Sequence, residues 1–273
     1  MDYKNAFGLP YEYPDLFEEH MLYVPKKADP PVLDENYPYV NKKLTFRLAR
    51  FGILIVSQTI GFILVKLLIG LKSQNRKILK KYKKELKGGA ISICNHVHMW
   101  DFICVMFALR HRSFFFPAWP KNLTGPNRHL VRLVGGMPIP KQKSGIVKFH
   151  NTIKNVLERG KWIHFYPETS AWFYFDAIRP FKKGVFSYAV KNNKPIIPLV
   201  ITFRDPKKIF RLIYRKKPLL TITVGEPIFP DQLLTEHDAT LKMLNQTRDW
   251  MQKTAGFSKI IDQNIKRRSE VEV

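Results

Sequence analysis

The pattern of apolar and polar residues changes at Gly88, where short apolar runs begin to alternate with longer amphipathic stretches. Four mostly apolar runs predict buried strands, at residues 90–94, 162–166, 196–202 and 219–224. The intervening stretches predict helices at residues 102–109, 146–159 and 185–190. Strands separated by helices are typical of an α/β fold. We therefore expect a single catalytic α/β domain with a mostly parallel sheet flanked by helices.

A longer apolar run precedes this domain. Residues 51–71 carry one charged side chain, Lys66, and contain no proline. A helix of that length extends about 31 Å at ~1.5 Å per residue, close to the hydrocarbon thickness of a bilayer. The alternative is a buried helix in a soluble core, because little of such an apolar helix could face water. We predict an N-terminal membrane-associated helix, and the pattern leaves open whether it spans the bilayer or lies in one leaflet.

A basic segment follows the apolar run. Residues 72–87 contain eight basic side chains and one acidic side chain. Such a segment beside a membrane helix is attracted to anionic lipids and favours the cytoplasmic side. Arg47 and Arg50 flank the other end of the helix, which weakens the orientation argument. We expect a membrane protein whose catalytic domain lies on the cytoplasmic face.

The two ends of the chain differ from the centre. Six prolines among the first 40 residues disfavour long helices there. Near the other end, Thr235 to Asp238 could cap a helix that continues to about residue 252, with a disordered basic tail after it. The chain is thus divided into a proline-rich extended arm (1–45), a membrane helix with a basic juxtamembrane segment (46–87), the catalytic domain (88–232), and a C-terminal helix with a basic tail (233–273).

Charge and cysteine content limit the classes of partner. The chain has 46 Lys and Arg against 22 Asp and Glu, a formal net charge of +24. A surface this basic attracts anionic partners, which include nucleic acid, anionic lipids, acidic carrier proteins and phosphate-bearing substrates. The two cysteines, Cys94 and Cys104, form no CxxC pair or zinc spacing. Both are expected to be buried free thiols.

The strongest candidate for chemistry lies at the end of the first predicted strand. His96 follows this strand, and Asp101 comes five residues later, where the next helix begins. The carboxyl ends of strands are where α/β sheets place their ligand crevices. With His96 on the turn and Asp101 in the opening turns of the helix, the carboxylate could hold the imidazole in one tautomer. The neutral imidazole could then accept a proton from a substrate hydroxyl. By spacing alone, a casually placed histidine beside a capping Asn95 or Asp101 is as good an interpretation.

A metal site is the rival interpretation of the same segment. His96 and His98 form a His-x-His pattern at a strand end, which occurs in metal sites. In hydrolases that use His-x-His-x-Asp-His, the Asp and the third His come four and five residues after the first. Here those positions hold Trp100 and Asp101, and no later Cys/His cluster supplies further ligands. We therefore predict no metal.

Three further segments follow in order along the chain. Residues 134–141 form a glycine-initiated extended run that ends in Lys141, residues 165–170 read Phe-Tyr-Pro-Glu-Thr-Ser, and residues 181–184 read Phe-Lys-Lys-Gly before a proline-flanked apolar strand. Together with the His96–Asp101 pair, this ordered set resembles the glycerophospholipid acyltransferase family, typified by lysophosphatidic acid acyltransferases of the PlsC type. The resemblance covers roughly residues 88–227. The family pattern reads Asn-His-x4-Asp, then Gly…Arg, then Phe-Pro-Glu-Gly-Thr-Arg, then Phe-Lys-x-Gly.

The resemblance implies a role for each matching residue. His96 would be the general base and Asp101 its orienting partner. Lys141 stands where the family has an arginine that binds the acceptor phosphate; it keeps the charge but loses the bidentate fork. The glycine expected after Glu168 is missing, and no arginine follows. The resemblance thus implies substrate-phosphate binding by Lys141, Glu168, Thr169 and Ser170, with additional contacts from Arg179, Lys182 and Lys183.

The implied activity is transfer of a fatty acyl group from an acyl thioester to the hydroxyl of 1-acyl-glycerol-3-phosphate in phospholipid synthesis. Acyl-CoA or an acidic acyl-carrier protein would be the donor substrate, membrane lipids and a lysophospholipid the other partners, and no cofactor would be needed. Backbone N–H groups after Asn95 could stabilise the oxyanion. Trp100, Phe102 and the aromatic run 114–119 could line an acyl groove or pack in the core. One alternative is an acyltransferase with another acceptor, such as glycerol 3-phosphate, another lysolipid or an aminolipid. A second is a non-enzymatic basic protein that binds lipid or nucleic acid, although no nucleic-acid module is recognised and we expect no nucleic acid as partner.

Overall fold

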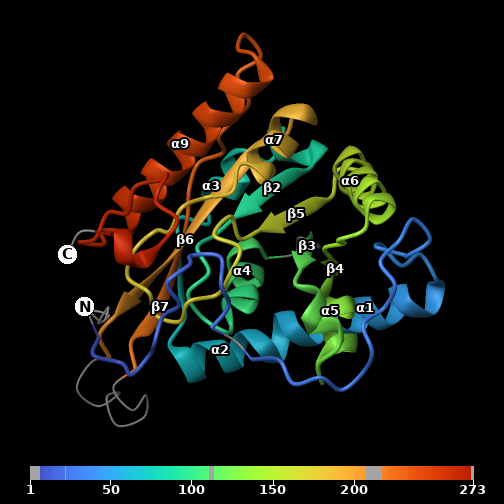
Figure 1. The fold of residues 1–273 in the computed structure, drawn as a ribbon, viewed down its shortest axis with the longest axis horizontal. Helices are drawn as coiled ribbons and strands as arrows, with labels where there is room; N and C mark the ends of the chain where they lie inside the picture. Colours follow the sequence, from blue (N-terminus) through green and yellow to red (C-terminus); the bar gives the residue numbers. More distant parts are fainter. Residues whose placement is uncertain (1–6, 22, 111–113, 207–216, 272–273) are drawn as a thin grey trace.

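A seven-stranded sheet forms the centre of the computed structural model, which describes residues 7–21, 23–110, 114–206 and 217–271 (Figure 1). The strand order is β1-β7-β6-β2-β5-β3-β4. The central strands β6, β2, β5, β3 and β4 are mutually parallel, and β7 with β1 runs in the opposite direction. The strands are β1 (Lys72–Gln74), β2 (Ala90–Ile93), β3 (Phe114–Ala118), β4 (Gly136–Pro138), β5 (Trp162–Phe165), β6 (Ile196–Arg204) and β7 (Leu219–Val224). The prediction of an α/β fold with a mostly parallel sheet is confirmed.

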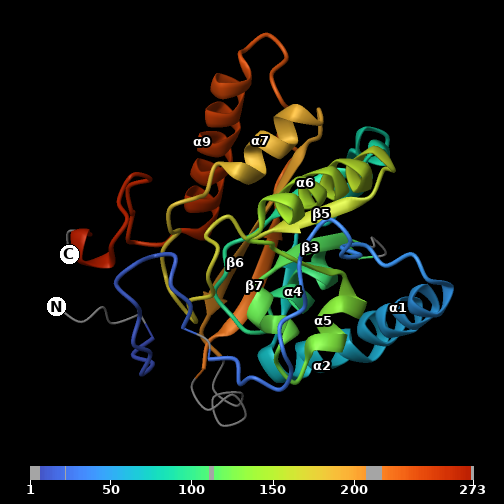
Figure 2. The ribbon, with the colours of Figure 1, turned by 45° about the vertical axis from the view of Figure 1, so that its right-hand side comes forward.

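Helices cover both faces of this sheet (Figures 1 and 2). One face packs against α6 (Lys143–Glu158), α7 (Gly184–Lys191) and α9 (Glu236–Ala255). The other packs against α4 (Asp101–Leu109), with α2 (Phe62–Ile69) outside it. Shorter helical segments are α3 (Ile78–Lys81), α5 (Arg128–Val134), η2 (Glu85–Gly88), η3 (Pro120–Leu123) and η4 (Arg268–Glu270). Because the sheet is buried on both faces, its central strands are mostly apolar, and consecutive residues are buried with no alternation.

The four apolar runs that predicted strands correspond to β2, β5, β6 and β7. The aromatic run after residue 113 forms β3, which pairs with β5 and β4, so it belongs to the sheet. The segment expected to be only juxtamembrane also contributes to the sheet. Its first three residues form β1, which pairs with β7. The sheet therefore begins at Lys72 and not after Gly88.

The apolar run forms one continuous helix, composed of α1 (Leu44–Val56), a π-helical turn η1 (Ser57–Gly61) and α2. It is 26 residues long, has a mean hydropathy of 2.2, and only 11% of its most apolar window is buried. By length and composition it could cross a membrane. It lies along the outside of the domain, where α1 contacts α5 and α2 contacts α4 (Figure 2). Arg50, on its inner face, donates hydrogen bonds to the carbonyl oxygens of Leu133 (3.2 Å) and Phe114 (2.9 Å).

The N-terminal arm lies against the domain, and its described residues, 7–21 and 23–43, form no helix or strand (Figure 1). Tyr13, Phe17 and Tyr39 anchor it, since each of these side chains is buried. The described part of the C-terminal tail packs against the arm, contrary to the disorder expected from its charge. Arg267 forms a β-bridge with Leu16, and the Arg268 N–H donates to the Asp15 carbonyl (2.7 Å). Backbone pairing to the arm thus orders the tail, and sequence patterning within the tail could not show this pairing.

Candidate active site

The turn between β2 and α4 is held rigidly at the carboxyl edge of the sheet. Asn95 is fully buried, and its side-chain amide donates to the Ile201 carbonyl (2.9 Å) while its oxygen accepts from the Ile201 N–H (2.8 Å). These two bonds connect the turn to β6 and satisfy the buried amide. Asn95 is therefore a structural anchor for the residue that follows it, His96.

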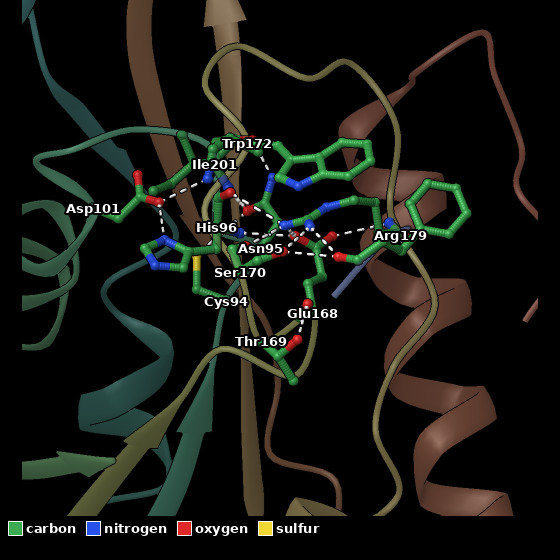
Figure 3. Close-up of polar contacts among 12 residues, drawn as sticks. Cys94, Asn95, His96, Asp101, Glu168, Thr169, Ser170, Trp172, Arg179 and Ile201 are labelled. Atoms are coloured by element: carbon green, nitrogen blue, oxygen red, sulfur yellow. Dashed lines mark hydrogen bonds and ion pairs between the residues drawn. The ribbon is translucent and has the colours of Figure 1, made fainter. Parts of the chain in front are cut away.

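His96 and Asp101 meet in this turn (Figure 3). The imidazole Nδ1 is 2.8 Å from Asp101 Oδ2, and that same oxygen accepts from the N–H groups of Val97 (2.7 Å) and His98 (3.0 Å). Asp101 is the first residue of α4 and is buried, whereas the His96 side chain is 24% exposed. A carboxylate can only accept, so Nδ1 carries the proton and Nε2 is left with a lone pair. The pair therefore has the geometry of an oriented general base.

The imidazole rests on an aromatic side chain. The Tyr166 ring stacks on His96 with centroids 4.0 Å apart and 13° between the planes, and His164 meets Tyr166 edge-on at 4.6 Å. His164 is fully buried with Nδ1 3.0 Å from Ser92 Oγ, and burial lowers the pKa of its imidazole to about 3. Burial likewise raises the pKa of the Tyr166 hydroxyl well above its usual value. Of the ionisable rings in this layer, His96 is thus the one placed to exchange a proton with a substrate.

A buried ion pair supports the backbone of His96. Glu168 Oε2 accepts from the His96 N–H (2.9 Å) and from Arg179 Nη2 (3.0 Å), and Oε1 accepts from the Arg179 N–H (2.9 Å) (Figure 3). Both side chains are completely buried. Burial lowers the pKa of Arg179, and the Glu168 carboxylate opposes this shift. The acid of the Pro-Glu-Thr motif therefore holds the turn that carries His96 instead of facing solvent.

Thr169 follows Glu168 at the position where the resembling motif has glycine. Thr169 has φ +68°, in the left-handed region that glycine adopts most easily, and its hydroxyl donates to the Glu168 carbonyl (2.7 Å). Ser170 is buried, and its hydroxyl donates to the Phe17 carbonyl (2.8 Å). The local backbone survives the missing glycine, at a strain cost of roughly 1 kcal/mol.

The structure separates the residues expected to bind phosphate. Lys141 is exposed and follows β4, so it lies at the same edge of the sheet as His96, three strands away. Lys183 is exposed at the start of α7, and Lys182 is exposed and paired with Glu18 of the arm. Arg179 cannot contact a phosphate in solvent, because it is fully buried and bonded to Glu168, Ser170 and Phe17. Its guanidinium pairs with the Glu168 carboxylate inside the protein, contrary to the expectation of a phosphate contact.

The groups of this turn that were expected to bind an oxyanion or a metal are bonded within the protein. The N–H groups of His96, Val97 and His98 donate to Glu168 and Asp101, so the groups expected to serve as oxyanion donors are already engaged. The His98 ring, half of the rival metal pair, accepts from the Trp100 N–H (3.1 Å) and lies 3.1 Å from the Tyr174 hydroxyl. Within the described part of the chain, no group of three or more His, Cys, Asp or Glu side chains could hold a metal ion.

Sequence reasoning missed the contribution of the N-terminal arm to this site. Phe17 contacts Ser170 and Arg179 through its carbonyl, and His20 stacks on Trp119 (4.0 Å, 14°) at the carboxyl end of β3. Burial, together with nearby positive charge, lowers the pKa of His20 to about 4. A cluster of aromatics among prolines was the only sequence pattern pointing to a packed arm.

Part of the chain that contains these residues is similar to known proteins. The family model described as "Acyltransferase" matches residues 71–202, just under half of the chain, and this range contains the His96–Asp101 pair, Lys141 and the Glu168–Arg179 ion pair. Among solved structures, the chain is similar to the crystal structure of the 1-acyl-sn-glycerophosphate (LPA) acyltransferase PlsC from Thermotoga maritima. The two are 17% identical, the match covers 77% of this chain and 96% of that chain, and the TM-score is 0.42. No curated protein sequence matched.

Proposed function

We propose that the protein transfers a fatty acyl group from an acyl thioester to the hydroxyl of a lysophosphatidate in phospholipid synthesis. The premise is that residues 71–202, which match the acyltransferase family model, form an acyltransferase domain. The observation that carries the proposal is the contact between His96 Nδ1 and Asp101 Oδ2 at the carboxyl edge of the sheet. Acyl-CoA and acyl-carrier protein are both suitable donors, since each presents a thioester.

The proposed reaction needs only the residues described and the two substrates. His96 Nε2 takes the proton from the acceptor hydroxyl as its oxygen attacks the thioester carbonyl. The tetrahedral intermediate then expels the thiolate, which receives the proton from the imidazolium, so that an ester and a free thiol are formed. Asp101 keeps the proton on Nδ1 and stabilises the imidazolium between these steps. Holding both substrates at the sheet edge makes the attack effectively intramolecular, and no cofactor is invoked.

Lys141 is proposed to bind the phosphate of the acceptor, because it is an exposed cation on the catalytic edge of the sheet. Lys141→Ala is expected to raise KM for lysophosphatidate roughly tenfold, with kcat changed much less, since one charge-assisted contact contributes about 1.5–3 kcal/mol. The measurement is acyl transfer by purified protein from labelled acyl-CoA to lysophosphatidate, glycerol 3-phosphate, lysophosphatidylcholine and a lysophosphatidylethanolamine.

Lys161 provides the matched control, because it is an exposed lysine that precedes β5 at the opposite edge of the sheet. Lys161→Ala should leave KM at its native value. A protein that acylates the amine- or choline-bearing acceptor as well as lysophosphatidate would favour the second candidate, an acyltransferase with a different acceptor. Transfer to none of the four acceptors, with either thioester donor, would refute the proposed function.

The long apolar helix is proposed to dock the domain onto one leaflet of a membrane. Its inner face is occupied by α4 and α5 along its length, which leaves an outward stripe of exposed apolar side chains: Leu44, Leu48, Phe51, Ile55, Ile63, Leu64, Leu67 and Leu68. A helix that packs lengthwise on a domain lies flat in the interface, as amphipathic anchors do. Met99 (64% exposed) and Trp100 (40%) add apolar surface beside His96.

Vesicle binding tests this docking. Replacing Leu48 and Leu67 together by glutamate is expected to lower partitioning onto phosphatidylglycerol vesicles more than tenfold, because each buried leucine contributes about 1.5–3 kcal/mol. Added salt should weaken native binding, since the basic segment 72–87 lies beside the helix. Leu233→Glu is the control, because Leu233 is 95% exposed in a loop before α9. Equal binding by the double variant and the control would show that the stripe is not the membrane contact.

A further inference from the structure

We propose that arm segment 13–20 is a positioning element of the catalytic site, which holds the loop 168–179 against the backbone of His96. The proposal rests on the proposed function insofar as His96 is the general base. It assigns to a proline-rich segment, 76 residues before His96 and outside the matched domain, a part in the chemistry.

Polar contacts join the arm to the loop 168–179. The Phe17 carbonyl accepts from Ser170 Oγ (2.8 Å) and from Arg179 Nη1 (3.0 Å). The Glu19 carbonyl accepts from the Trp172 indole N–H (2.9 Å). Ser170, Trp172 and Arg179 are fully buried; without the arm, the Ser170 hydroxyl and the Trp172 indole N–H would lose these acceptors, and Arg179 would lose one of its acceptors. The arm therefore satisfies polar groups that the loop itself cannot satisfy.

Arg179 and Glu168 connect these contacts to the proposed general base, His96. Arg179, held by Phe17 through Nη1, donates through Nη2 to Glu168 Oε2 (3.0 Å). The same carboxylate oxygen accepts from the His96 N–H (2.9 Å). Arg179 Nη2 also lies 3.4 Å from the His96 carbonyl. One guanidinium thus joins the arm to both sides of the His96 backbone, and a shift of the arm is transmitted to the imidazole.

Apolar packing keeps the arm in place. The rings of Phe17 and Tyr13 lie on Trp172, with centroids 5.3 and 5.5 Å away, in an apolar cluster separate from the two that cover the sheet. Ile261 of the C-terminal segment completes this third cluster. The tail then fastens the outer side of the arm, where the Ser269 N–H donates to Asp15 Oδ1 (2.9 Å). Segment 13–20 accordingly lies between the loop 168–179 and the tail, with the side chains of Tyr13 and Phe17 buried.

The end of the segment extends this contact to the edge of the site. His20 stacks on Trp119, directly after β3. Burial lowers the pKa of this second imidazole to about 4, which keeps it neutral near pH 7. The arm therefore extends from the loop to the carboxyl end of β3.

The test compares two arm variants of the full-length protein, Phe17→Ala and Tyr39→Ala. Each removes one buried aromatic ring, but Tyr39 packs on Phe149 of α6 in a different apolar cluster. Phe17→Ala is expected to lower kcat by tenfold to about a hundredfold, because misplacement of a catalytic group by about 1 Å has an effect of that size. Tyr39→Ala, at a similar loss of thermal stability, should keep kcat within about twofold. Phe17→Leu, which retains most of the apolar volume, should recover most of the activity.

A readout that does not depend on acyl transfer separates this proposal from the proposed function. The rate at which diethyl pyrocarbonate modifies His96, followed by peptide mass spectrometry, should rise about threefold or more in Phe17→Ala as the turn loosens. Modification of His237, on α9, should not change. If the native protein transfers no acyl group, the proposed function fails while this rate still decides the role of the arm.

Two results would overturn the proposal. One is an equal fall of kcat in Phe17→Ala and Tyr39→Ala, which would show that the arm contributes stability alone. The other is a native rate of His96 modification in Phe17→Ala. Should that variant fail to fold, Tyr13→Phe replaces it, since it removes only the hydroxyl that donates to the Phe173 carbonyl (2.7 Å) and keeps the ring. Native His96 reactivity in Tyr13→Phe would then count equally against the proposal.

Discussion

Replacing His96 by alanine is expected to lower kcat for acyl transfer by about 10²–10⁴-fold, the usual contribution of a positioned general base. Stability should change little, because the His96 side chain is partly exposed and its ring makes one hydrogen bond, to Asp101. KM for the thioester should remain near its native value, since the imidazole acts on the reacting hydroxyl. The measurement is single-turnover acyl transfer, with thermal unfolding as the check on folding.

Asp101→Asn is the matched variant for this prediction. An asparagine oxygen in the place of Oδ2 can still accept from the N–H groups of Val97 and His98 and from His96 Nδ1, so the turn should keep its shape. Its NH₂ group would then take the place of Oδ1, and the neutral amide would no longer stabilise the imidazolium that forms when His96 takes the proton. We expect a loss of activity comparable with that of His96→Ala. Near-native turnover of His96→Ala would remove His96 from the mechanism, and near-native turnover of Asp101→Asn would remove the carboxylate from it.

The second large effect is expected at the buried ion pair. Arg179→Met should lower the free energy of unfolding by about 3–5 kcal/mol, because it leaves the Glu168 carboxylate buried without its cation. The two side chains are 3.0 Å apart and fully buried, so solvent cannot compensate. Urea denaturation, monitored by the tryptophan fluorescence to which buried Trp172 contributes, measures the change.

A double variant gives the control for this prediction. Arg179→Met with Glu168→Gln removes the unpaired charge, and it should recover part of the lost stability. The outcome also separates two roles of Arg179. If Arg179→Met instead raised KM for lysophosphatidate and left the urea midpoint unchanged, Arg179 would bind phosphate, as the family resemblance first implied. The buried position favours the stability effect.

Most of the central sheet was predictable because its strands are buried on both faces. β2, β5, β6 and β7 are therefore short apolar runs that sequence alone identifies. β1 and β4 have three residues each, too few for a periodic pattern, and they become strands only by pairing with a neighbour. The long apolar helix spans residues 44–69, whereas the apolar run predicted it from residue 51. Its extra N-terminal turns belong to α1, which packs on α5.

The contact between His96 and Asp101 was predictable for a local reason. His96 and Asp101 are five residues apart, so a turn followed by a helix is enough to bring them together. Glu168 was recognised as part of the site, but its task was assigned incorrectly, because the choice between a substrate phosphate and Arg179 depends on burial. The loop that buries them contains no periodic pattern from which its path could be deduced.

The sequence by itself determined the α/β order of the domain, the long apolar helix and the His96–Asp101 pair, because each depends on residues that are near in the chain. Only the tertiary structure decided that Arg179 is enclosed with Glu168, and that Phe17 reaches across 162 positions to hold it. The reason is physical: a buried charge needs partners that the folded chain must supply, and the partners available depend on which distant segments the core brings together.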